Sequence, residues 1–213
     1  MTYRQRLKAV LSPPERTVFA ALNSPKKIQD YLDTLPINFE TAGETYMSPR
    51  RVIREHTAHC FEGALLAAAA FSYHGQKPLL LDLVTIDRDE DHVVALFRQN
   101  GLWGAISKTN HPILRYRDPV YKSVRELAMS YFHEYMMDDG TKSLRRFSKA
   151  FDLRRYSPAL WAVAEEDLFW LVDALDDSRH YDVAPRKVIA QLRKASEVEV
   201  KAINNTEWRD PRK

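Results

Sequence analysis

The longest continuous apolar pattern lies in the middle third of the chain. The stretch from about Ala58 to Tyr73 contains CFEGALLAAAAF, which is long enough for a buried helix, and Thr57 can serve as its N-cap. Its run of alanines allows close packing against a sheet or another helix. Gly75 then stops the helix, and Pro78 cannot extend it.

Three short apolar runs follow this helix and predict strands. They read LLLDLVTI, HVVALFR and LWGAISK, each bounded by polar residues, glycine or proline. The first two are joined by the polar turn DRDED. The last two are joined through Asn100-Gly101, a pair suited to a two-residue type I′ turn. The centre of the chain therefore predicts one helix followed by an antiparallel meander.

Both flanks of this central region predict mainly helices. Ser12, Pro13 and Glu15 together form a capping-box signature for a helix that starts at residue 13. Other helices are expected to begin at Ser24-Pro25 and Ser48-Pro49, and to run from Pro119 to about Met136, from Ala164 to Leu175 and through VIAQLRKA. The stretch VEVKAIN has no clear helix or strand pattern.

These elements predict a single α+β domain over residues 1–213. Its core over residues 57–110 would be a central antiparallel sheet of at least three strands, with the cysteine-bearing helix packed on it. The flanking segments 1–56 and 118–213 would supply peripheral helices. A chain of 213 residues fits one such domain.

Composition and charge narrow the class of protein further. Hydrophobic residues make up 45% of the chain, which is far too many for a disordered protein. The net charge of +3 is too small to imply strong attraction to nucleic acid or acidic membranes. A single cysteine excludes an internal disulfide framework and fits a reducing compartment. We expect a soluble, cytoplasmic protein without a signal peptide, because no apolar run is long enough to span a bilayer.

The single cysteine, Cys60, falls in the first turn of the predicted helix. A helix N-terminus offers free N–H groups and the positive end of the helix dipole, and both stabilise a thiolate. His92 opens the second predicted strand and could take the thiol proton. A helix packed across the meander would bring the two side chains together. They are candidates for a nucleophile and its general base.

A third group should hold the imidazole in one tautomer, and the register of the hairpin decides which. With a two-residue turn, His92 lies opposite Thr109, and Ser107 lies on a diagonal. A loop longer or shorter by one residue brings Asn110 or Lys108 opposite instead. Asn110 and Ser107 both carry an oxygen that can accept from an imidazole N–H.

The order of these features resembles the core of the transglutaminase-like superfamily, whose fold is related to papain-like thiol proteases. The chain offers CFEGALLAAAAF, then GQKP, then DHVVALF, then GLWGAIS. By this resemblance Cys60 is the nucleophile and His92 the base. The family's usual aspartate falls near Ser107, and Asn110 could replace it, since papain-like enzymes use asparagine. Val94 stands where the family tends to have an aromatic residue.

The resemblance covers about a quarter of the chain, and it implies acyl transfer. We expect no cofactor and no metal. Cys60 would attack an amide or ester carbonyl to give a thioester, and His92 would protonate the leaving group. Asn110, or Ser107 in second place, would orient the imidazole. His59 and the 46–51 loop are candidates for the oxyanion hole. The substrate would be a peptide, a protein or a small amide or ester.

Three alternatives stay open. The first is a catalytically inactive relative that serves as a binding or assembly module. The second is a metal site made of His56, His59 and Cys60 with His92 as a further ligand. The third is nucleic-acid binding through residues 142–155, which contain six cations, one acid and two phenylalanines. Acidic stretches such as AEEDLF dilute that basic field, so we expect no nucleic-acid partner.

Overall fold

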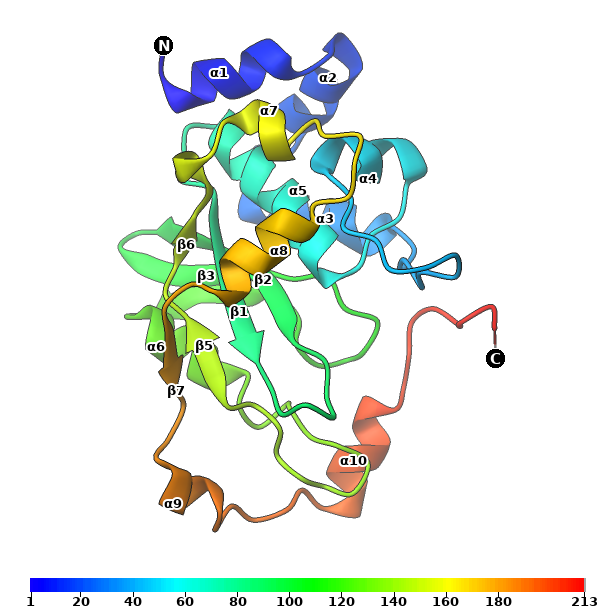
Figure 1. Cartoon of the computed structure of the whole chain (residues 1–213), viewed down its shortest axis with the longest axis vertical. Helices are drawn as coiled ribbons and strands as arrows, with labels where there is room; N and C mark the ends of the chain where they lie inside the picture. The colour runs from blue at the N-terminus through cyan, green and yellow to red at the C-terminus, as the bar shows by residue number, and fades with distance from the viewer. Residues whose placement is uncertain (213) are drawn as a thin grey trace.

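The protein, described over residues 1–212 by a computed structural model, has an α+β fold built on one seven-stranded sheet (Figure 1). Every strand pair is antiparallel, and the order is β4-β3-β2-β1-β5-β7, with β6 also paired to β1. The strands are β1 Leu79–Val84, β2 His92–Gln99, β3 Leu102–Ile106, β4 Arg117–Tyr121, β5 Arg146–Ser148, β6 Phe151–Asp152 and β7 His180–Asp182.

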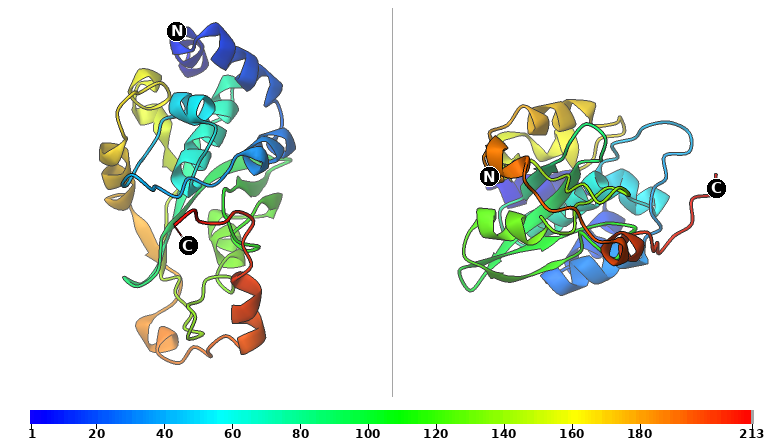
Figure 2. Two further views of the ribbon diagram at one scale, coloured as in Figure 1. Left: turned by 90° about the vertical axis from the view of Figure 1, so that its right-hand side faces the viewer. Right: turned by 90° about the horizontal axis from the view of Figure 1, so that it is seen from below.

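Helices surround the sheet and occupy both ends of an elongated molecule. Figures 1 and 2 show α1 and α2 at one end and α9 and α10 at the other. The helices are α1 Tyr3–Val10, α2 Pro13–Ala21, α3 Pro25–Thr34, α4 Pro49–Glu55, α5 Cys60–Tyr73, α6 Val124–Ser130, α7 Pro158–Trp161, α8 Phe169–Asp176, α9 Arg186–Ile189 and α10 Glu197–Ile203, with a 3-10 turn at Leu153–Arg155. Of the helices in the described residues, none has the length and apolarity to cross a bilayer.

The local capping signals place the N-terminal helices where they are expected. The Ser12 side chain accepts from the backbone N–H of Glu15, and the Glu15 carboxylate accepts from the backbone N–H of Ser12. The Ser24 and Ser48 side chains cap α3 and α4 by accepting from the backbone N–H three residues on, and each serine is followed by proline at the first helical position.

The N-cap of α5 differs from the prediction. Thr57 does not cap this helix, because its hydroxyl donates to the carbonyl of Pro36. His59 is the N-cap, and Cys60 is the first helical residue. The helix ends before Gly75, whose φ of +88° only glycine adopts without strain.

The central meander forms as predicted, and its hairpin has the two-residue turn. Gln99 pairs with Leu102 across it, and Asn100 and Gly101 both have positive φ, as a type I′ turn requires. The ladder runs back to Ala95 opposite Ile106. Beyond Ile106 the chain continues in this direction alongside the start of β2, where the candidate site lies.

Of the helix predicted from residue 119 to about 136, only α6, Val124–Ser130, is present. Residues Arg117–Tyr121 form β4, which pairs with the otherwise open edge of β3. Pro119 is tolerated there because an edge strand has one unpaired side. The helical spacing of the apolar residues is real only after Ser123, which caps α6. Val120 is therefore exposed rather than part of an apolar helix face.

The later chain also departs from the predicted helices. Within residues 142–155, Phe147 lies on β5 and Phe151 on β6, and the two rings enter different apolar clusters. The helix expected from Ala164 begins only at Phe169. The one expected through VIAQLRKA is limited to α9, and VEVKAIN supplies α10 instead.

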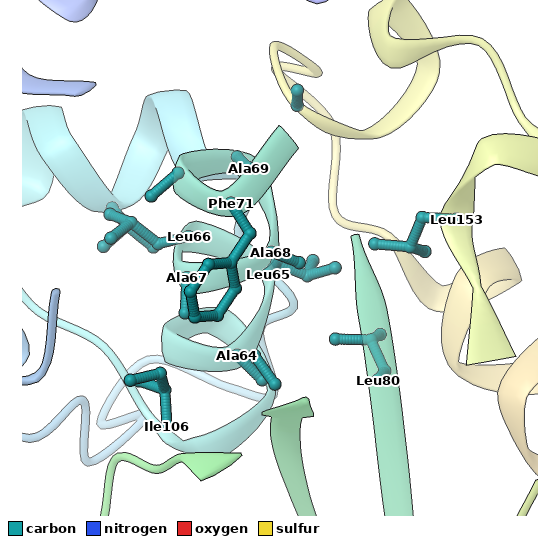
Figure 3. Close-up of a cluster of buried hydrophobic side chains, with 14 of the residues drawn as sticks. Ala64, Leu65, Leu66, Ala67, Ala68, Ala69, Phe71, Leu80, Ile106 and Leu153 are labelled. Atoms are coloured by element: carbon teal, nitrogen blue, oxygen red, sulfur yellow. The ribbon is translucent and has the colours of Figure 1, made fainter. Parts of the chain in front are cut away.

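Alternation along the strands divides the core into two clusters, one on each face of the sheet. Leu80 points to the α5 face, where the small side chains of Ala64 and Ala67 let the helix approach closely (Figure 3). Leu81 and Leu83 point to the opposite face, under α6. Because α5 is apolar almost all round and covered by α1, α3 and α4 as well, it is the central helix of the fold.

Candidate functional site

Cys60 occupies the first position of α5, where the helix meets the end of the sheet that carries the start of β2. The thiol is free and half-buried. Burial on its own would raise the pKa of Cys60, but hydrogen bonds with His59 and His92 and the charges of both imidazoles hold that pKa well below the ordinary value. The side chain is therefore suited to exist as a thiolate at neutral pH.

His92 and Ser107 form a directed pair in the interior. Nε2 of His92 lies 2.7 Å from Oγ of Ser107, and both residues are buried. The Ser107 hydroxyl donates its own proton to the carbonyl of Leu114, so its oxygen must accept from His92. Nε2 therefore carries a hydrogen. Nδ1 is left to meet the thiol and can take its proton.

Gln29 of α3 fixes the backbone of Ser107 beyond the last pair of the β2–β3 ladder. Its side-chain amide donates to the Ser107 carbonyl at 2.8 Å and accepts from the Ser107 N–H at 3.1 Å. The same amide also donates to Asp33. Ser107 is thus held by three hydrogen bonds, two between its backbone and Gln29 and one from its hydroxyl to Leu114.

A close approach between α5 and the chain after β3 brings the thiol and Ser107 segments together. A Cβ added to Gly63 would lie 2.7 Å from Cβ of Lys108, so only glycine fits there. Lys108 itself is buried and donates from Nζ to the carbonyl of Leu35. Burial lowers its pKa. This contact positions the first turn of α5 against the residue that follows Ser107.

His59 contacts the thiol from the other side. Its Nε2 lies 2.8 Å from the carbonyl oxygen of Thr45 and 3.4 Å from Oε1 of Glu62. The other ring nitrogen is left for Cys60, and a ring that donates from both nitrogens is the protonated form. Burial would lower the pKa of His59, but its hydrogen bond to Cys60 and the charges of Cys60 and Glu62 raise it to about 9. His59 is a cation at neutral pH.

A fully buried carboxylate, Glu62, organises the loop that holds His59. It accepts from the backbone N–H groups of His59 and Met47, at 2.9 and 3.0 Å. It also accepts from the Asn38 amide at 3.1 and 3.2 Å and from the Thr45 hydroxyl at 3.1 Å. These bonds satisfy the carboxylate without water and fasten the 38–47 loop beside the first turn of α5.

Asn110 has a different place from the one expected. Its side chain does not orient His92. It donates from Nδ2 to the carbonyl of Trp208 at 3.0 Å and accepts from the Trp208 N–H at 2.8 Å. The reason is the two-residue hairpin, which places Ser107 on the diagonal of His92 and carries Asn110 out of the ladder. Of the four predicted site residues, Cys60, His92 and Ser107 lie together.

A second buried pair, Asp82 and His180, joins β1 to β7 next to this region. Nε2 of His180 lies 2.9 Å from Oδ2 of Asp82, and its Nδ1 lies 2.7 Å from the carbonyl of Ser178. Burial raises the pKa of Asp82, against the hydrogen bond from His180. That hydrogen bond raises the pKa of His180. Both nitrogens of His180 are occupied, so this pair holds the sheet together.

The imidazoles are not arranged around a metal position. Across residues 1–212, no group of three or more His, Cys, Asp or Glu side chains is placed to hold a metal ion. His56 is exposed and ends α4 in a left-handed conformation with a φ of 55°. His59 and Cys60 belong to the next helix and face the protein interior instead.

Gln29 and Glu62 are the site residues that the sequence analysis missed. Glu62 had a readable signal, since it is the only charged residue in the apolar run of α5 and stands three positions after the N-cap. Gln29 had none, because it meets Ser107 across 78 positions of sequence.

No protein-family model matches the chain, and no curated protein is significantly similar to it in sequence. Arguments about function therefore depend on the chemistry of the site.

Proposed function

We propose that the protein is a thiol-dependent hydrolase or acyltransferase with a transglutaminase-like, papain-related site. The observation that carries this proposal is the chain of contacts from Cys60 to His92 to Ser107. It provides a nucleophile with a lowered pKa, a base with one free nitrogen, and a group that fixes the tautomer of that base.

In this reaction the Cys60 thiolate attacks the carbonyl carbon of an amide or ester. A C–S bond forms, and the carbonyl electrons move to oxygen, where free N–H groups in the first turn of α5 and the cationic His59 can stabilise the charge. The imidazolium of His92 gives its proton to the leaving amine or alcohol as the bond to carbon breaks. Water or a second amine then attacks the thioester, with His92 as base, and releases the thiolate.

Ser107 can position the His92 imidazole, but its hydroxyl lacks the negative charge of a carboxylate. A hydroxyl can hold Nε2–H, but it does not offset the charge of the imidazolium as an aspartate does. His59 and Glu62 add a second ion pair on the other side of the thiol. We infer that this pair takes over part of the electrostatic work that the missing acid would perform.

The test is covalent labelling of the thiol. Iodoacetamide should alkylate Cys60 with a pH midpoint well below that of a free thiol, about 8.5. A simple activated ester should acylate the protein once, and loss of the label from Cys60→Ser would assign it to that residue. His92→Ala should slow both reactions near neutral pH at least 10-fold. A thiol that reacts only after denaturation would end the proposal.

The basic segment 142–155 gives no comparable support to nucleic-acid binding. Lys142 is buried and donates to the carbonyl of His133, and Arg154 is paired with Asp152 at 2.6 Å. Arg155 lies over the ring of Phe151. These cations are used within the fold rather than presented together on a free surface.

A further inference from the structure

Residues 203–208 lie across the segment that follows β3. The carbonyl of Ile203 contacts Nδ1 of His111 at 2.7 Å, and the backbone N–H of Glu207 donates to the carbonyl of Asn110 at 2.9 Å. The side chain of Asn110 holds both backbone groups of Trp208. Figures 1 and 2 show the chain after α10 running along one side of the molecule toward its middle.

The way Asn110 holds Trp208 is recognition of peptide backbone. A primary amide offers one donor and one acceptor side by side, which match the C=O and N–H of a single residue. Such a pair of bonds does not depend on the side chain that it holds. Arg115 adds a side-chain preference, since its Nη2 lies 2.9 Å from Oε2 of Glu207. The combined surface fits an acidic residue followed by any residue with a free backbone.

The contact between residues 203–208 and the segment after β3 leaves one buried polar group without a partner, and it lies close to the thiol site in sequence. Nε1 of Trp208 is buried and has no hydrogen-bond partner among the described residues, which weakens the bound state of this segment. Asn110 stands three residues after Ser107. Further along, the pKa of Arg212 is raised by its hydrogen bond to Asp210, by the charge of Asp210 and by that of Glu40.

Glu40 in turn belongs to the loop around the thiol. Its Oε1 lies 3.9 Å from Nε2 of His59 and accepts from the Thr45 N–H at 2.7 Å. The contacts of residues 203–208 are thus with the segment after Ser107, while the charge of Glu40 acts on Arg212 from the loop that holds His59. These are the two segments that flank Cys60.

We propose that residues 107–115 form a binding edge for acidic peptide segments, and that residues 203–208 of the chain occupy this edge as an internal competitor. This inference rests on the proposed function for its consequence, because a peptide bound at the edge would be presented to Cys60. The binding itself is independent of thiol chemistry. A tethered segment competes at an effective concentration of about 1 mM, so a free peptide binds well only when the tether is weakened.

The experiment uses the full chain and a fluorescein-labelled acidic peptide with the sequence of residues 203–208, INNTEW. Glu207→Arg places a second cation beside Arg115 and should release residues 203–208 from the edge. Asn110 and Arg115 themselves are unchanged. We expect faster hydrogen exchange at the Trp208 amide and peptide binding at least 5-fold tighter than in the wild type. Adding Asn110→Ala should abolish the gain. Asn205→Ala, an exposed change in the same segment, should match the wild type.

Two outcomes overturn the inference. One is release of the segment, seen as faster exchange at Trp208, without any gain in peptide binding. The other is a gain that survives Asn110→Ala. Iodoacetamide titration of Cys60 in the same variants keeps this result separate from the proposed function. A normal low midpoint with no peptide binding would leave the thiol chemistry in place and remove the edge alone.

Discussion

Nε2 of His92 donates to Oγ of Ser107 over 2.7 Å, and the Ser107 hydroxyl donates onward to the carbonyl of Leu114. The direction of both bonds follows from the single proton of the hydroxyl. This relay fixes which nitrogen of His92 is free, and it does so without a carboxylate.

Removal of that hydroxyl should slow the thiol. In Ser107→Ala, His92 loses its acceptor and can adopt the other tautomer, so the iodoacetamide rate at pH 7 should fall about 3- to 10-fold, as expected for a lost hydrogen bond. Ser143→Ala is the matched control, because Ser143 is equally buried and its hydroxyl has no hydrogen-bond partner in the described part of the chain. Equal rates in the two variants would show that Ser107 does not position His92.

His59 should set the pH range in which the thiol is ionised. Its pKa of about 9 keeps it cationic at neutral pH, so His59→Gln removes a positive charge from the thiolate. The midpoint of alkylation should then rise toward about 8.5, the value of a free thiol. Stopped-flow alkylation between pH 5 and pH 10 would measure it. His133→Gln changes an exposed imidazole and should leave the midpoint unchanged.

Glu62→Gln should destabilise the fold. The side chains and N–H groups around Glu62 are donors, and the new amide would turn two N–H donors of its own toward them. We expect the free energy of unfolding to fall by about 1–3 kcal/mol, the usual cost of unsatisfied buried groups. Urea titration followed by tryptophan fluorescence would report it. Glu197→Gln, in the exposed first turn of α10, should change stability by less than about 0.5 kcal/mol.

The Asp82–His180 pair predicts a pH dependence of stability. Both pKa values are raised in the folded protein, so the native state binds these protons more tightly than the unfolded state does. For His180 this stabilisation is complete below about pH 6.5 and is lost as pH rises through the folded pKa; for Asp82 the loss starts lower, above about pH 4. Relative to Asp82→Asn, the wild type should therefore be most stable at acid pH.

Urea unfolding of both proteins from pH 4 to pH 9 would test this sign. The stability of the wild type minus that of Asp82→Asn should decrease steadily as pH rises. Asn205→Ala, an exposed change that alters no ionisable group, should give a difference that does not change with pH. A difference that grows with pH would mean that Asp82 is stabilised as the anion instead.

The parts of the fold that local chemistry determines could be predicted from the sequence. The capping box of Ser12 and Glu15 and the turn at Asn100-Gly101 involve neighbours, and both formed as expected. Strand β4 could not be predicted, because its pairing with the edge of β3 outweighs the helical spacing that starts at Val120. A sheet edge needs a partner, and sequence periodicity does not contain that requirement.

The residues of the candidate site also differ in whether local sequence could predict them. Cys60 and His92 could be proposed from their positions at a helix start and a strand start. Choosing Ser107 over Asn110 required the hairpin register, which shifts every side chain when it slips by one residue. The bonds from Gln29 depend on how α3 packs against the end of β3, and no local pattern encodes that packing.

Because Gly63 of α5 packs closely against Lys108, the reactivity of the Cys60 thiol reports whether α5 is packed against the sheet. Cys60, His92 and Ser107 come from three separate segments that meet only when α5 is seated against the closed meander. An isolated α5 helix would carry an ordinary sulfhydryl. Rapid alkylation can therefore begin only late in folding, and even slight local opening around the α5 N-terminus should extinguish it long before the sheet itself unravels.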